Sequence, residues 1–141
     1  MSKEIDVLFI AGFGPIVKDD TESQKLYIET LNLPLKKSGN YCQTEELSGA
    51  KHFALWPLSQ AALSCFGIKN WPQDIPVPQS WIEFDVQDIV KATEVMQTKG
   101  YNLLVSNRKE PWGQTVTRFL SPEGMLVGLT YTPWLRDNGK Q

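Results

Sequence analysis

Residues 110–131 read EPWGQTVTRFLSPEGMLVGLTY, and the fold assignment starts from this segment. The segment holds two β-prone runs, Thr115 to Leu120 and Leu126 to Tyr131, separated by Ser121-Pro122-Glu123-Gly124. Proline followed closely by glycine is typical of a tight turn, so two consecutive strands joined by a β-turn are predicted. Pro111-Trp112-Gly113 predicts a further turn just before the first of these strands.

A strand and a helix are predicted before this segment. Residues 81–86, WIEFDV, alternate apolar and polar side chains as a strand does. Asp88 is a candidate N-cap for a helix that Gly100 ends. The apolar face of this helix comprises Ile89, Ala92, Val95 and Met96. A strand over Tyr101 to Val105 is expected to follow.

The first half of the chain has a similar order of elements. Val7 to Val17 is apolar and β-prone, which predicts a buried strand. A helix is expected over Thr21 to Leu31, with N-cap oxygens at Asp19-Asp20-Thr21 and a capping box between Thr21 and Gln24. A hairpin over Leu35 to Leu47 is then expected.

Lys51 to Leu58 predicts a half-buried strand, with Phe53 and Leu55 on one face. The opposite face would carry His52, Ala54 and Trp56. Ser59 is a candidate cap for a short helix that ends at Gly67.

The two halves match at a fixed offset, which indicates an internal duplication. The matched pairs are Val17 with Val86, Asp19 with Asp88, and Leu26 with Val95. One domain over residues 1–141 is therefore expected, with modules at about 5–69 and 80–134. The proline-rich residues 70–79 would form a linker, and residues 135–141 a tail.

Composition excludes several classes of protein. The 141 residues are 41% hydrophobic, with a formal net charge of -2 and a pI of about 5.4. The basic residues are scattered, so no nucleic-acid partner is expected. No apolar run approaches a bilayer span and the N-terminus lacks a signal-peptide core, so a cytoplasmic protein without a membrane partner is predicted. Cys42 and Cys65 belong to no CxxC pattern and are expected to be free thiols.

The helix from Asp88 to Tyr101, with Glu110 to Gly113 and Arg118 to Gly128, resembles the vicinal-oxygen-chelate superfamily of glyoxalases, bleomycin-resistance proteins and extradiol dioxygenases. Ser121 and Met125 stand where the family pattern has Asp and Asn. The resemblance implies an α+β fold in which two tandem βαβββ modules form a cup with their curled mixed sheets. Strand alternation then directs one set of side chains into the cup. This set is Trp81, Glu83, Asp85, Val116, Arg118, Leu120, Leu126, Gly128 and Thr130.

The resemblance also implies positions for a divalent metal, but the residues there do not suit one. The family ligand positions fall at Gly12, Trp81 and Gly128, and none of these side chains can donate an electron pair to a metal. No metal cofactor is therefore expected. Two alternatives stay open for His52, the only histidine: an improvised metal site with Glu83 and Asp85, or a surface or hydrogen-bonded position.

The cup is instead predicted to bind a small organic molecule. Trp56, Trp81 and Trp112 would supply aromatic walls, Glu83 a negative charge and Arg118 a positive one, which suits a cationic or aromatic ligand. Alternatively, Glu83 and Arg118 pair with each other and leave a nearly neutral pocket. A third possibility makes both catalytic: Glu83, with a raised pKa, would act as a base and Arg118 would hold the developing oxyanion.

The resulting hypothesis is a ligand-binding protein without metal. One alternative is a lyase, isomerase or dioxygenase with a rearranged site, and another is a non-catalytic interaction protein with a vestigial cup. A homodimer is expected, and Trp134 is expected to serve as a lid or a dimer contact rather than a pocket wall.

Overall fold

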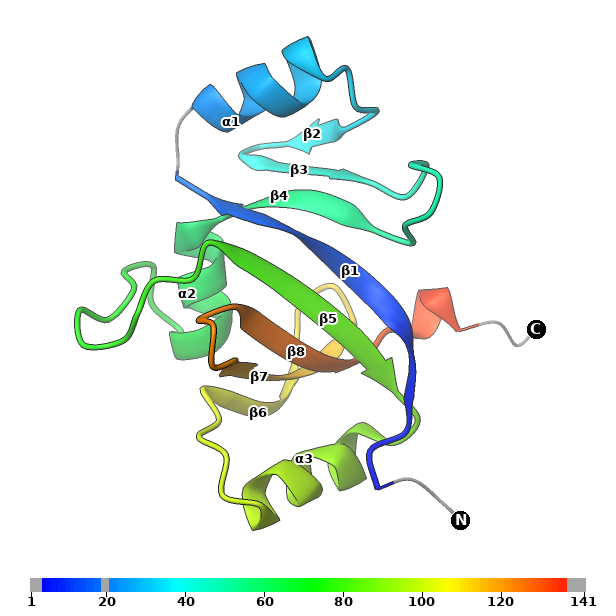
Figure 1. Cartoon of the computed structure of the whole chain (residues 1–141), viewed down its shortest axis with the longest axis vertical. Coiled ribbons are helices and arrows are strands. Elements are labelled where there is room, and N and C mark those ends of the chain that lie inside the picture. Colours follow the sequence, from blue (N-terminus) through cyan, green and yellow to red (C-terminus); the bar gives the residue numbers. More distant parts are fainter. Residues whose placement is uncertain (1–3, 19–20, 137–141) are drawn as a thin grey trace.

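A computed structural model describes residues 4–18 and 21–136 of the chain (Figure 1). In chain order its elements are β1 (Val7–Val17), α1 (Glu22–Gln24), the π-helix η1 (Lys25–Thr30), β2 (Lys36–Ser38), β3 (Tyr41–Thr44), β4 (Phe53–Pro57), α2 (Leu58–Phe66), β5 (Ser80–Val86), α3 (Ile89–Thr98), β6 (Val105–Lys109), β7 (Thr115–Leu120), β8 (Leu126–Tyr131) and the 3₁₀ helix η2 (Pro133–Leu135). None of the helices in this described part has the length and apolarity needed to cross a bilayer.

The eight strands form one curled sheet in the order β2-β3-β4-β1-β5-β8-β7-β6 (Figure 1). Strand β1 pairs parallel with β4, and β5 pairs parallel with β8, so each module repeats the same arrangement. The modules join through the antiparallel pairing of β1 with β5 at the centre. The predicted α+β fold of two βαβββ modules is confirmed, and the cup lies on the concave face.

Helix α3 covers the convex face of the second module as predicted. The Asp88 carboxylate accepts a hydrogen bond of 3.1 Å from the Lys91 amide, and Gly100 takes a left-handed conformation with φ of 87°. The packed side chains are Val86, Ala92, Met96 and Leu129. Burying such residues stabilises the fold by about 1.5–3 kcal/mol for each large apolar side chain.

The helix of the first module differs from its prediction. It begins at Glu22, and Thr21 makes no capping hydrogen bond with its side chain, so the expected capping box is wrong. Asp19 and Asp20 lie outside the described residues. From Lys25 the backbone adopts a π-helix, in which the Leu31 amide donates to the Leu26 carbonyl across five residues. The helix buries no residue fully and packs through Tyr27 and Ile28.

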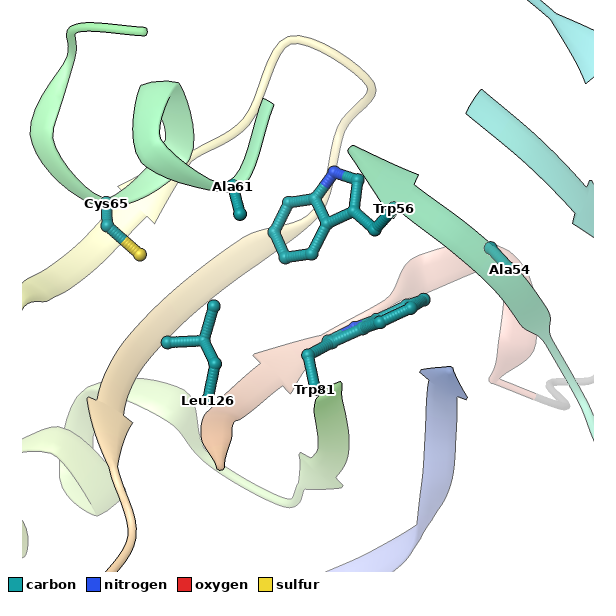
Figure 2. Packing of buried hydrophobic residues seen from close by; sticks show 6 residues of the cluster. All are labelled: Ala54, Trp56, Ala61, Cys65, Trp81 and Leu126. Atoms are coloured by element: carbon teal, nitrogen blue, oxygen red, sulfur yellow. The ribbon is translucent and has the colours of Figure 1, made fainter. Parts of the chain in front are cut away.

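Helix α2 lies against the concave side of the sheet, where it adds a layer (Figure 2). The cluster that it helps to form comprises Ala54, Trp56, Ala61, Cys65, Trp81 and Leu126. Because α2 covers one face of β4 and η1 packs near the other, every residue of β4 is buried, and the predicted half-buried strand is wrong. Pro57, not Ser59, precedes the helix, and Gly67 ends it as expected.

The sixth strand lies four residues later than predicted, at Val105–Lys109 instead of Tyr101 to Val105. This edge strand is polar and largely exposed, so it lacks the apolar alternation that predicts strands. It is held by backbone pairing with β7 and by the Thr117 hydroxyl, which accepts a 3.0 Å hydrogen bond from the Asn107 amide.

Candidate functional site

A cavity of about 680 Å³ opens on the concave face. Both modules contribute to its walls, and so does the C-terminal η2 turn. The aromatic side chains among the lining residues are Tyr41, Trp56, Trp81, Trp112 and Trp134. All the predicted ligand-binding residues (Trp56, Trp81, Glu83, Trp112, Arg118) therefore lie around one cavity. Trp134 also lines it, whereas the sequence suggested a lid or dimer contact.

We call Trp56, Trp81, Glu83 and Arg118 the inner wall of the cavity. Trp56 on β4 and Trp81 on β5 are buried, with ring centroids 5.3 Å apart and planes inclined by 55°. Figure 2 shows the Trp56 indole between α2 and Trp81. Gly14 permits this packing, because a Cβ there would lie 2.9 Å from the Trp81 ring and 1.9 Å from the Ala54 carbonyl oxygen.

Trp112 and Trp134 form what we call the rim. Both are half-exposed, at 51% and 52%, because Trp112 belongs to the turn before β7 and Trp134 to η2. The Trp112 indole N–H donates a 3.0 Å hydrogen bond to the side-chain oxygen of Gln114. The rim side chains are therefore half-exposed to solvent, whereas Trp56 and Trp81 of the inner wall are buried.

Glu83 and Arg118 pair with each other, so the pairing alternative describes the geometry. Arg118 Nη1 lies 3.1 Å from Glu83 Oε2, and its guanidinium carbon lies 4.8 Å from the centroid of the Trp56 ring. Gly128 separates the two on the intervening strand β8. A Cβ at Gly128 would lie 3.1 Å from Arg118 Nη1, so the glycine makes room for the pair.

A second carboxylate completes the surroundings of Arg118, whose side chain is 0% exposed. Glu110 Oε2 lies 3.8 Å from Arg118 Nη2, and Glu110 Oε1 accepts a 2.9 Å hydrogen bond from Arg108 Nε. From α2, the Ser64 hydroxyl donates to Glu110 and accepts from Arg118 Nε. Two arginines and two glutamates thus balance, which makes the burial of these charges tolerable.

Gln114 also lines the cavity, although no periodic pattern or motif predicted it. Its side-chain N–H₂ group donates to Glu83 Oε1 at 2.9 Å and to the Thr132 hydroxyl at 2.8 Å. Both carboxylate oxygens of Glu83 are therefore engaged, one by Gln114 and the other by Arg118. This geometry does not favour Glu83 as a free general base, whereas Nη1 and Nη2 of Arg118 are buried and make no hydrogen bond to the described residues.

Asp85 does not line the cavity, contrary to the strand-alternation prediction. The buried carboxylate accepts hydrogen bonds from the hydroxyls of Thr130 and Thr132, at 2.6 and 2.7 Å. It also pairs with Arg136, whose Nε lies 2.7 Å from Oδ2. These contacts attach the segment that carries Trp134 to the sheet, so Asp85 has an anchoring role at this site.

The described residues do not fit a divalent metal ion. They contain no cluster of three or more His, Cys, Asp or Glu side chains that could hold one. At the family ligand position on β8, Gly128 is flanked by the Arg118 guanidinium, whose positive charge would repel a cation. The Trp81 indole nitrogen is buried without a hydrogen-bond partner, and it is a donor only.

His52 takes part in a chain of three side chains at the cavity. The Tyr41 hydroxyl lies 2.6 Å from His52 Nε2, and His52 Nδ1 lies 3.3 Å from Glu45 Oε2. Burial, reinforced by the negative charges of Glu83 and Glu45, raises the pKa of the Tyr41 hydroxyl well above its ordinary value. Extending the β3–β4 register places Glu45 opposite His52, a relation that only the strand pairing reveals.

Comparison with known proteins places the fold. A family model described as "Glyoxalase/Bleomycin resistance protein/Dioxygenase superfamily" matches residues 10–129. No curated protein sequence matches the chain.

Several solved structures are similar in fold. A superfamily member from Vibrio splendidus has 15% identity and a TM-score of 0.54, over 89% of this chain and 97% of that one. A Streptomyces coelicolor methylmalonyl-CoA epimerase variant in complex with 2-nitronate-propionyl-CoA has 16% identity and a TM-score of 0.56, over 94% and 99%. A Legionella pneumophila protein described as an NAD-dependent benzaldehyde dehydrogenase has 11% identity and a TM-score of 0.55, over 84% and 96%.

At these identities the structural likenesses speak for the fold alone, whereas the family model covers most of the sequence. The chain belongs to the glyoxalase/bleomycin resistance protein/dioxygenase superfamily.

Proposed function

We propose that this protein binds a flat aromatic organic molecule in its cavity without the help of a metal ion. One observation carries the proposal: four of the five tryptophans line a single cavity, although they come from four separate segments. Core packing alone accounts for Trp56 and Trp81, but it leaves the half-exposed Trp112 and Trp134 unexplained. Aromatic walls of this kind suit a flat ring system.

The charges around the cavity favour a neutral or cationic ligand. The charged lining residues include three carboxylates and two cations: Glu45, Glu46, Glu83, Lys36 and Arg118. Glu83 and Arg118 balance each other, and Lys36 pairs with Glu46 at 3.6 Å. The remaining negative charge is that of Glu45, and indole faces attract cations in addition.

An anionic ligand is the competing possibility, because the similar Streptomyces epimerase is described in complex with a coenzyme A compound. The phosphates of such a ligand would need cations at the cavity. Lys36, however, is already paired, and Arg118 is fully buried beside two carboxylates. We therefore expect coenzyme A thioesters to bind more weakly than flat uncharged or cationic rings.

Calorimetric titration with three tricyclic probes tests the proposal: 9-aminoacridine (cation), acridone (neutral) and anthracene-9-carboxylate (anion), each with and without EDTA. Trp112→Ala and Trp134→Ala should weaken binding about three- to tenfold, the value of one lost aromatic contact. Trp71→Phe is the matched control, because Trp71 packs on Phe66 outside the cavity. The proposal fails if no probe saturates, or if Trp71→Phe weakens binding as much as the rim variants do.

A cytoplasmic location and a homodimer stay predictions. Exposed apolar side chains on β1 (Val7, Leu8, Ile10 and Phe13) are consistent with a contact between copies. Light scattering at several concentrations would measure the oligomeric state directly.

A further inference from the structure

The proposed aromatic binding draws on the charge of Glu45 but makes no use of the contacts that join Tyr41, His52 and Glu45, although all three side chains line the cavity. Tyr41 lies on β3, Glu45 just after it, and His52 just before β4. The Tyr41 and His52 rings stack nearly parallel, inclined by 20°. A phenol, an imidazole and a carboxylate connected in this order form a path along which a proton can move.

The carboxylate fixes the direction of this path. Because an ionised glutamate can only accept hydrogen bonds, we assign the imidazole proton to Nδ1, the His52 nitrogen that faces Glu45. In the neutral imidazole the other nitrogen, Nε2, is then a bare acceptor, and it faces the Tyr41 hydroxyl at 2.6 Å. The hydroxyl donates to Nε2, and its oxygen lone pairs remain available to a molecule in the cavity.

The environment of Tyr41 disfavours the ionised, phenolate form of its side chain. Burial and the neighbouring Glu83 and Glu45 raise its pKa, and the nearby Arg118 opposes this only in part. Tyr41 alone would therefore be a poor base near neutral pH. Tyr41 becomes an effective base if it passes its own proton to His52 while it takes another from the ligand, because no phenolate then forms.

We propose that Tyr41, His52 and Glu45 form a metal-free proton relay that removes a proton from an activated carbon of a flat molecule bound in the cavity. In this step the ligand C–H proton moves to the Tyr41 oxygen while the Tyr41 proton moves to His52 Nε2. The C–H electron pair remains on the ligand, where an adjacent electron-withdrawing group takes it up. The imidazolium then returns its proton to the ligand or to solvent. Tyr41 is the catalytic residue; His52 accepts the proton through it, and Glu45 positions His52.

This inference rests on the proposed binding, and one probe can test the two separately. The probe is 5-nitrobenzisoxazole, a flat uncharged heteroaromatic with one acidic C–H. Loss of that proton breaks the ring N–O bond, forms a nitrile and releases coloured 2-cyano-4-nitrophenolate. Quenching of tryptophan fluorescence reports binding, and absorbance reports turnover.

Tyr41→Phe and His52→Gln should each lower kcat about 100-fold, the usual value of general acid–base catalysis, with KM changed less than about twofold. Glu45→Gln should cause a smaller loss. Tyr101→Phe and Glu94→Gln are matched controls on exposed residues of the second module, and they should keep the wild-type rate.

The pH profile separates a relay from a structural role. Wild-type kcat should fall on acidification, because the imidazolium cannot accept a proton, and His52→Gln should lose this dependence. Charged groups facing the relay are Glu45, Glu83 on β5 and Arg118 on β7, so the Glu45→Gln profile is recorded as well. Binding without acceleration, or an unchanged rate in Tyr41→Phe, would overturn the relay and leave the binding proposal intact. Absence of binding would overturn both.

The sole histidine allows a test that needs no substrate. The nitrogen-15 spectrum of the wild type should show one imidazole with its proton on Nδ1. The relay is excluded if the proton is on Nε2, since that nitrogen could not then accept one from Tyr41.

Discussion

The two modules share a strand order but differ in how each supports the cavity. The second has a capped α3 that packs on a buried cluster, and it contributes the buried Arg118 and its two glutamates. The first has an uncapped π-helix that buries no residue fully and a short, exposed β2 edge strand. The Tyr41–His52–Glu45 chain belongs to this first module.

This difference indicates that the two modules of the duplicated fold have different roles at the cavity. The second module supplies three of the four inner-wall residues (Trp81, Glu83 and Arg118), its charges are paired in the interior, and its helix packs on a buried cluster. The first supplies Trp56 to the inner wall and the Tyr41–His52–Glu45 chain, and its π-helix and β2 edge strand bury no residue fully. Elements with little buried apolar surface open more easily, which suits ligand entry.

Replacing Arg118 should have the largest effect on stability. Arg118→Met leaves Glu83 and Glu110 buried without their shared cation, which should lower the free energy of unfolding by about 3–5 kcal/mol. Urea unfolding measures the change. The counterpart in the first module is Lys36→Met, which breaks the exposed pair with Glu46 and should cost less than about 1 kcal/mol. Equal losses would contradict the division between modules.

Substitutions in the two outer helices should have the next largest effect on stability, and the effect should differ between the modules. Met96→Ala empties a buried site between α3 and the sheet and should cost about 2–3 kcal/mol. Leu26→Ala, in the π-helix, removes a side chain that is 48% exposed and should cost about 0.5 kcal/mol or less. Thermal unfolding of both variants checks the contrast, and a Leu26→Ala loss as large as that of Met96→Ala would refute it.

Much of the fold followed from local signals. Asp88, Gly100 and the turn at residues 121–124 act through their own backbone, so sequence alone located their elements. The strand at Val105–Lys109 was misplaced because backbone pairing, not side-chain alternation, holds this edge strand. The missing cap at Thr21 shows that a matching pattern does not ensure the hydrogen bond.

The site was less accessible to sequence analysis. Alternation brought Trp81, Glu83 and Arg118 to the cup face, and the structure places them around one cavity. Gln114 and the Tyr41–His52 contact depend on how distant strands pair and on where α2 fills the concave face, which no periodic pattern encodes. Asp85 was misassigned because contacts with Thr132 and Arg136 enclose its carboxylate.

Removing a helix N-cap should have a smaller effect on stability, and only in the second module. Asp88→Ala loses the hydrogen bond from the Lys91 amide and should cost about 1 kcal/mol in the free energy of unfolding. Thr21→Ala, at the equivalent end of the first-module helix, removes no such bond and should leave stability nearly unchanged. Paired urea titrations would compare them, and a clear loss in Thr21→Ala would mean that this helix is capped in solution.

The pH dependence of the contribution of Cys65 to stability should be the smallest of these effects, and it should appear only above neutral pH. Burial raises the pKa of Cys65 from 9.0 to about 11, so its contribution to stability is complete below pH 9 and is lost as the pH rises towards 11. The stability gap between the wild type and Cys65→Ala should therefore narrow over that interval. A constant gap would mean that Cys65 ionises freely. Cys42 is buried as well, so both thiols should resist alkylation in the native protein.

Fluorine NMR of protein labelled with 5-fluorotryptophan would show directly whether a ligand enters the cup, because the five tryptophans divide into four at the cavity and one outside it. On titration with acridone or 9-aminoacridine, the resonances of Trp56, Trp81, Trp112 and Trp134 should shift with one common dissociation constant. Trp71 should stay unchanged. Shifts confined to Trp71, or no saturable shift at the cavity tryptophans, would contradict a ligand-binding cup.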